Sequence, residues 1–115
     1  MDIKAMVNEM NQMVLEGKIL DAFEKYYADE VVMQEINMEP VVGKDANRER
    51  EQKWFSGITE FRGAEVTNVA VGDNVSMVEW FMDYSHKEYG EVKMNQVAVQ
   101  TWVNDKIVKE VFYHG

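Results

Sequence analysis

The chain has 115 residues, enough for one domain around one core, and its 46% hydrophobic content excludes a disordered protein. A net charge of -9 argues against nucleic acid and anionic membrane surfaces, because both are bound through Lys and Arg. The chain has no cysteine, which excludes disulfides, and no apolar run long enough for a signal peptide or a membrane span. We therefore expect residues 1–115 to form a single domain located in the cytoplasm.

The first half of the chain has the periodicity of helices. Apolar residues from Ile3 to Val14 recur every three or four positions, which predicts an amphipathic helix. Gly17 interrupts the pattern, and a second helix is expected to continue to about Ala28. A short strand is expected over 31–36, followed by a polar helix over 45–55.

After Gly57 the apolar residues alternate with period two, which is typical of half-buried strands. We place strands near 60–71, 75–86, 91–103 and 106–114, separated by turn signals rich in Gly, Asp and Asn. Helices that are separate in sequence from an antiparallel sheet indicate an α+β fold.

The strand over 75–86 has one mainly apolar and aromatic face. That face carries Val78, Trp80, Met82, Tyr84 and His86, and we assign it to the helix-covered side, with His86 exposed at its end. The opposite face carries Met77 and Phe81, beside Val97 and Val99 of the next strand. Large apolar residues on an outer face often mark a subunit contact, so we expect a homodimer. The alternative is a set of isolated surface apolar residues, which are common.

The register of the last hairpin decides which residues share a face. A three-residue loop over 103–105 would pair Ala98 with Glu110, whereas a two-residue loop over 104–105 would move Glu110 to the opposite face from Gln100. We expect the three-residue loop, because the small side chain of Ala98 leaves space for a carboxylate.

In that register, amides, a carboxylate and aromatic rings converge on one surface, which is typical of a small-molecule pocket. The predicted substrate-binding residues are Trp80, Tyr84, Gln96, Gln100, Trp102 and Phe112. Two alternatives stay open: the amides could satisfy only the protein, and Glu110 could form a salt bridge with Arg48, Arg50 or Arg62. The two histidines lie far apart and no ligand-spaced motif occurs, so we expect no metal and no cofactor.

Three segments carry a resemblance to a known family. The stretches KYYADEVVMQE, VVGKDA and QTWVNDKIVKEVFY resemble the nuclear transport factor 2-like superfamily, and within it the SnoaL-like branch, which includes polyketide cyclases and is related to ketosteroid isomerases. The resemblance implies a cone: three helices packed on a strongly curved, mainly antiparallel sheet with a pocket inside. Many members of this family dimerise.

The ketosteroid isomerases use an aspartate base and two oxyanion donors, a tyrosine and a protonated aspartic acid. By resemblance, the base position falls on Glu35, the tyrosine on Met10 and the acidic donor on Ala98. Without those donors, steroid isomerase activity is not expected.

Two functions stay open. One is a cofactor-free isomerase, cyclase or hydratase/hydrolase that uses Glu35 and Glu110 as catalytic residues on a small hydrophobic molecule. The other is a non-catalytic ligand-binding or dimeric interaction domain.

Overall fold

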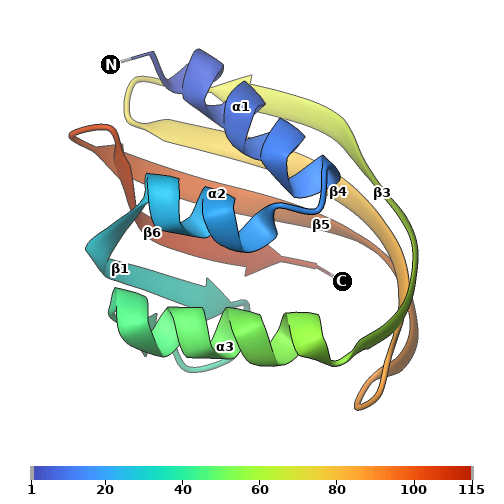
Figure 1. The fold of residues 1–115 in the computed structure, drawn as a ribbon. Helices are drawn as coiled ribbons and strands as arrows, with labels where there is room; N and C mark the ends of the chain where they lie inside the picture. Colours follow the sequence, from blue (N-terminus) through green and yellow to red (C-terminus); the bar gives the residue numbers. More distant parts are fainter. Residues whose placement is uncertain (1, 115) are drawn as a thin grey trace.

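The computed structural model describes residues 2–114 and contains three helices and one six-stranded sheet (Figure 1). In chain order the elements are α1 (Ile3–Leu15), α2 (Ile19–Tyr26), β1 (Tyr27–Glu35), β2 (Val41–Val42), α3 (Lys44–Ser56), β3 (Ile58–Val71), β4 (Val75–His86), β5 (Gly90–Val103) and β6 (Lys106–Tyr113).

The sheet has the order β2-β1-β6-β5-β4-β3, and only β1 and β6 run parallel. The long strands bend around the three helices, which lie on the concave side (Figure 1). The predicted α+β cone with a curved, mainly antiparallel sheet is therefore confirmed. Within residues 2–114 no helix is both long enough and apolar enough to cross a membrane.

The junction between α2 and β1 lies earlier than the sequence pattern indicated. The helix ends at Tyr26, and Tyr27 already has extended backbone with φ -97° and ψ 134°. The prediction that the second helix continues to Ala28 is therefore wrong. The reason is tertiary: Tyr27 and Val31 are both buried, and the extended backbone directs Tyr27 toward Glu110 of β6.

The short strand β2 and a buried amide fix α3 against this edge of the sheet. Val41 and Val42 pair with Met33 and Val32 of β1. The Nδ2 of the fully buried Asn47 donates to the carbonyl oxygens of Val41 and Gly43, at 2.9 and 2.8 Å. This clamp makes α3 one wall of the space that the sheet encloses.

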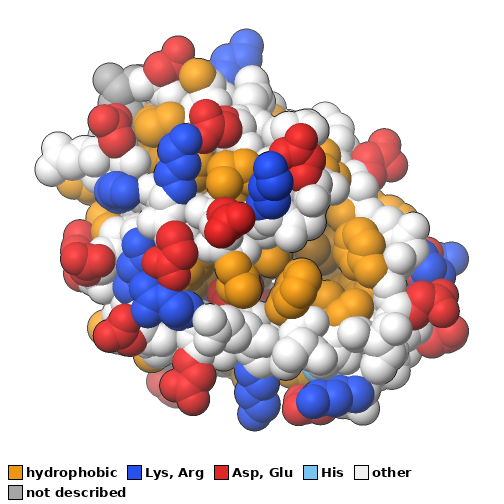
Figure 2. All heavy atoms as spheres, in the orientation of Figure 1, with side chains coloured by type: hydrophobic (Ala, Val, Ile, Leu, Met, Phe, Trp, Pro, Cys, Tyr) orange, Lys and Arg blue, Asp and Glu red, His pale blue; other side chains and the backbone are white. Residues whose placement is uncertain are grey.

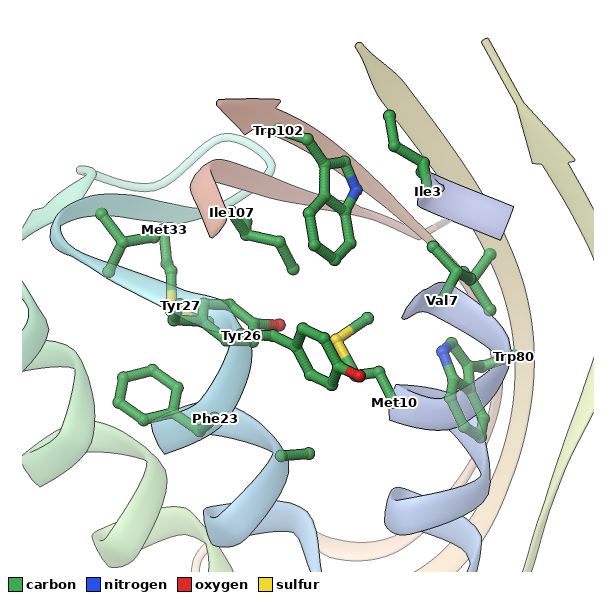
Figure 3. Close-up of a cluster of buried hydrophobic side chains, with 13 residues drawn as sticks. Ile3, Val7, Met10, Phe23, Tyr26, Tyr27, Met33, Trp80, Trp102 and Ile107 are labelled. Carbon is green, nitrogen blue, oxygen red and sulfur yellow. The ribbon is translucent and has the colours of Figure 1, made fainter. Parts of the chain in front are cut away.

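Helix side chains and sheet side chains meet in one core on the concave side (Figure 3). From β4, Val78, Trp80 and Tyr84 are buried, as predicted for the helix-covered face. His86 is only 4% exposed, so the prediction that it is exposed is wrong. It is buried because its ring stacks on Tyr89 and lies against Gly57, where α3 ends.

The β5–β6 hairpin corrects the predicted register. Val103 pairs with Lys106 around a two-residue turn, in which Asn104 and Asp105 both have positive φ. The predicted three-residue loop and the predicted Ala98–Glu110 pair are therefore wrong.

A β-bulge explains why Glu110 still faces inward. Thr101 pairs with Lys109 but Trp102 pairs with Ile107, so one additional residue lies on β6 between these pairs. A bulge shifts the register by one residue, which exchanges the two faces of the strand. Glu110 consequently pairs with Gln100, on the concave side.

Candidate functional site

The helices and the concave face of the sheet enclose a cavity of about 700 Å³. Figure 2 shows hydrophobic side chains around a hollow on the helix side of the molecule. The apolar and aromatic lining includes Met10, Phe23, Trp54, Trp80, Met82, Tyr84, Ala98 and Phe112. The polar lining includes Tyr27, Glu35, Arg50, Glu51, Gln96, Gln100, Glu110 and His114. A largely apolar space with a few polar groups is typical of a small-molecule site.

A chain of buried hydrogen bonds ends on Glu110. The indole Nε1 of Trp102 donates to Ser76 Oγ at 2.9 Å, and this hydroxyl donates to Gln100 Oε1 at 2.6 Å. Gln100 Nε2 donates to Glu110 Oε2 at 2.7 Å, and the Tyr27 hydroxyl donates to Glu110 Oε1 at 2.5 Å. Neither Glu110 nor Gln100 is more than 2% exposed, so water cannot replace these partners.

Burial makes Glu110 an unusual carboxyl. Loss of hydration raises its pKa to about 7, although the donors Tyr27 and Gln100 act to lower it. The nearby carboxyl of Glu51 raises the pKa further, and Arg50 lowers it. Burial and Glu110 together raise the pKa of Tyr27 well above its ordinary value. Near neutral pH, Glu110 therefore exchanges between its two protonation states while Tyr27 keeps its proton.

Helix α3 adds a charged pair to the cavity wall. Arg50 Nη2 lies 3.7 Å from Glu51 Oε1. Burial raises the pKa of Glu51, Arg50 lowers it, and Glu35 raises it. Within residues 2–114, the buried Nε of Arg50 has no hydrogen-bond partner. The cavity wall thus contains the guanidinium of Arg50 together with three glutamates, Glu35, Glu51 and Glu110.

The mouth of the cavity holds a second acid–base pair. Glu35 Oε2 lies 2.9 Å from His114 Nε2, and each side chain is 35% exposed. Because Glu35 pairs with Phe112 of β6 and Met33 pairs with Glu110, the mouth is two residues along the strands from the buried carboxyl.

His86 fixes another part of the cavity wall. Its Nδ1 accepts from the backbone N–H of Glu88 at 3.1 Å, so its Nε2 carries the proton and donates to the Trp54 carbonyl at 3.0 Å. These contacts join the end of α3 to the turn between β4 and β5. Among the described residues, no group of three or more His, Asp or Glu side chains is arranged to hold a metal ion.

The comparisons with known proteins agree with this architecture. A family model described as the SnoaL-like domain matches residues 1–114. The chain belongs to the SnoaL-like family. The predicted membership of the nuclear transport factor 2-like superfamily is thereby confirmed. No curated protein matches the sequence.

Several solved structures share the fold of this SnoaL-like domain. A protein from Mesorhizobium loti assigned as a SnoaL-like polyketide cyclase is 28% identical, with a TM-score of 0.88 over 98% of this chain and 99% of that one. A nuclear transport factor 2-like protein of unknown function from Burkholderia xenovorans is 19% identical, with a TM-score of 0.77 over 98% and 82%. A protein from Jannaschia assigned as a SnoaL-like polyketide cyclase is 11% identical, with a TM-score of 0.79 over 96% and 85%.

Most of the side chains predicted to form the site of this SnoaL-like domain meet in the cavity. Its lining includes Glu35, Trp80, Tyr84, Gln96, Gln100, Glu110 and Phe112. Trp102, predicted to bind substrate, does not line the cavity; it is 1% exposed in the core and donates to Ser76 behind Gln100. Glu110 accepts its hydrogen bonds from Tyr27 and Gln100 rather than from an arginine.

The sequence pattern did not indicate Tyr27, Ser76 or Glu51 as members of this site, and it suggested Arg50 only as an alternative partner of Glu110. The expected second helix included Tyr27. Arg50 and Glu51 belong to a helix that has no apolar face, so the sequence carries no signal for which side of it is buried. Met10 and Ala98, the positions that resemblance aligns with oxyanion donors, both line the cavity as apolar residues.

Proposed function

We propose that this domain binds a small, largely apolar molecule with an oxygen acceptor and transfers a proton to or from it without a cofactor. The supporting observation is Glu110, a buried carboxyl in the wall of an apolar cavity with a pKa of about 7. Such a group donates and accepts protons at neutral pH, which general acid–base catalysis requires.

The two acid–base positions have complementary roles in this proposal. Glu110 acts as the acid near the ligand oxygen, and Glu35, paired with His114 at the mouth, acts as the base. Isomerisation, cyclisation and hydration all need one proton removed and another delivered. The Mesorhizobium and Jannaschia proteins assigned as polyketide cyclases are compatible with this chemistry.

Binding can be tested with 2-acetylnaphthalene, a bicyclic ketone, by quenching of tryptophan fluorescence, since Trp54 and Trp80 line the cavity. We expect saturable binding that Ala98→Phe abolishes, because Ala98 lines the cavity and a benzyl group there would occupy the ligand volume. Val99→Phe, on the neighbouring residue that faces the other side of the sheet, is the matched control. Equal binding by Ala98→Phe and the wild type would contradict the proposed site.

Catalysis can be tested on the same ketone by its methyl proton exchange in D₂O, followed by NMR. We expect the domain to accelerate exchange and Glu35→Gln to abolish the acceleration without loss of binding. If the ketone binds and exchange is not accelerated, the domain binds without catalysing proton transfer. The apolar residues Met10 and Ala98 favour that second candidate, a ligand-binding domain.

A homodimer through the outer sheet face remains a proposal. Met77 is 44% exposed there and pairs with Val99, which in turn pairs with Val111 across the sheet. We expect Phe81→Glu to shift the light-scattering mass from dimer to monomer, whereas Leu15→Glu on helix α1 leaves it unchanged. A monomeric wild type at micromolar concentration would contradict the proposal.

The cytoplasmic location also stays a prediction.

A further inference from the structure

The hydrogen-bond chain behind Glu110 has a fixed direction. An indole N–H only donates, so Ser76 Oγ must accept from Trp102. The single hydroxyl proton of Ser76 then points to Gln100 Oε1, which turns the Nε2 of that amide toward Glu110. Each proton position follows from the one before it.

The opposite orientation of the Gln100 amide is disfavoured. With Nε2 turned toward Ser76, the hydroxyl would accept from both Gln100 and Trp102, and its own proton would lose the acceptor that Oε1 provides. Ser76 is 0% exposed, so water cannot accept that proton. Trp102 therefore fixes the orientation of the Gln100 amide through Ser76.

The fixed amide determines where neutral Glu110 carries its proton. Oε2 faces an N–H of Gln100, so a proton there would meet another donor. The acidic proton consequently lies on Oε1, 2.5 Å from the hydroxyl oxygen of Tyr27. The hydroxyl oxygen of Tyr27 must then accept a hydrogen bond from Glu110. The hydroxyl proton of Tyr27 no longer points to Glu110 and can be donated to another acceptor.

We propose that Tyr27 is the residue that donates to the ligand oxygen, with Glu110 as its proton source and with Trp102, Ser76 and Gln100 as positioning residues. This rests on the proposed function, because Tyr27 and Glu110 line the cavity described above. On transfer, the Tyr27 hydroxyl proton goes to the ligand oxygen and the Glu110 Oε1 proton goes to Tyr27. The net change is one proton from Glu110 to the ligand, and Tyr27 ends neutral.

If Tyr27 is the donor, the preference of the cavity for a ligand with an oxygen acceptor depends on pH. Ionised Glu110 takes the Tyr27 proton back into its own hydrogen bond, so the donor is free only while Glu110 is neutral. The groups that face Glu110 are Tyr27 from β1, Gln100 from β5, and Arg50 and Glu51 from α3. Since burial raises the pKa of Glu110 to about 7, the preference for an oxygen acceptor should be present below that pH and lost above it.

The test compares 2-acetylnaphthalene with 2-ethylnaphthalene, which has a similar shape but no acceptor. For the wild type at low pH we expect the ketone to bind about tenfold more tightly than the hydrocarbon, from one additional hydrogen bond. Tyr27→Phe should lose this preference at every pH while binding the hydrocarbon normally. A preference that survives in Tyr27→Phe would overturn the proposal.

The positioning residues need a measurement that a purely structural role would not change. We expect Trp102→Phe and Ser76→Ala to weaken the low-pH preference and to shift the infrared carbonyl band of neutral Glu110, which Glu110→Gln identifies by its loss. Thr101→Val, beside Gln100 on the opposite face of β5, should change neither. An unshifted band in both variants, with urea unfolding confirming that they fold, would overturn the inference.

The infrared measurement needs no ligand, so it separates the two proposals. If neither naphthalene compound binds, the proposed function fails and the Tyr27 donor role fails with it. The band shifts then decide only whether the chain fixes the proton of Glu110. If the compounds bind but the preference does not follow pH, only the inference about Tyr27 is overturned.

Discussion

Two glutamates line one cavity from neighbouring strands, yet their surroundings differ. Glu110 is 2% exposed and contacts two neutral donors, whereas the Glu35 side chain is 35% exposed and pairs with His114. On the parallel pair β1 and β6, Glu110 lies beside Met33 and Glu35 beside Phe112. A displacement of two residues along a strand therefore separates a buried acid from a carboxylate at the mouth. Burial, rather than residue type, distinguishes the two carboxyl groups.

Disrupting the buried end should have the largest effect. Trp102→Ala removes a fully buried ring and leaves Ser76 without its donor, so we expect a loss of roughly 3–5 kcal/mol in the free energy of unfolding. Urea denaturation measures this loss. His114→Ala, at the mouth, is the comparison and should change the same quantity by less than about 0.5 kcal/mol. Similar losses in both variants would show that the two ends do not differ as described.

The pH dependence of stability should distinguish Glu110 from an ordinary glutamate. Its pKa rises from 4.5 to about 7 on folding, so the folded state binds the proton more tightly. Its stabilising contribution is therefore complete below pH 4.5 and is lost as pH rises to about 7. Relative to Glu110→Gln, the wild type should lose about 3 kcal/mol over this range. Parallel stability curves for the two proteins would contradict the assignment.

A smaller effect is expected at the fixed part of the wall near His86. A methyl group on Gly57 would lie 2.3 Å from Nε2 of that ring, so Gly57→Ala must displace it. We expect a loss of about 1–3 kcal/mol, as for other overpacked sites, seen as a lower thermal midpoint. Gly63→Ala is the matched control, because an added Cβ there meets no atom within 4 Å. Equal midpoints for the two variants would argue against a rigid wall.

The smallest effect on stability is expected at the mouth. A contact as exposed as that between Glu35 and His114 contributes little, so Glu35→Gln should change the free energy of unfolding by less than about 0.5 kcal/mol. The same variant should lose ketone proton exchange. Loss of exchange without loss of stability would separate the chemical role of Glu35 from a structural one; a large loss of stability would remove that separation.

The periodic parts of the fold could be predicted from the sequence, because apolar spacing follows the face that each element buries. The register of the last hairpin could not. The turn at Asn104 and Asp105 favours two residues, but a bulge beyond it reverses the faces again, and no local signal marks that additional residue. The predicted pair was wrong, although Glu110 still lies on the same face as Gln100.

The site could be predicted where strand alternation applies and not where partners come from distant elements. Gln96, Gln100 and Phe112 follow the alternation of β5 and β6 into the cavity. Tyr27 contacts Glu110 across 83 positions in sequence, and extended backbone at the helix end makes that contact possible. The functional roles, the homodimer and the single-domain organisation stay predictions.

The most direct test of this account is the titration of Glu110 itself. In protein labelled with ¹³C at the glutamate side-chain carboxyl carbons, NMR from about pH 3 to about pH 9, a range that extends below the ordinary pKa of about 4.3 and above the raised one, follows each carboxyl separately. We predict one resonance, absent in Glu110→Gln, with its midpoint at about pH 7. If the resonance that Glu110→Gln removes titrates below about pH 5, like an ordinary glutamate, the buried carboxyl is not the proton-exchanging group and the proposed chemistry is contradicted.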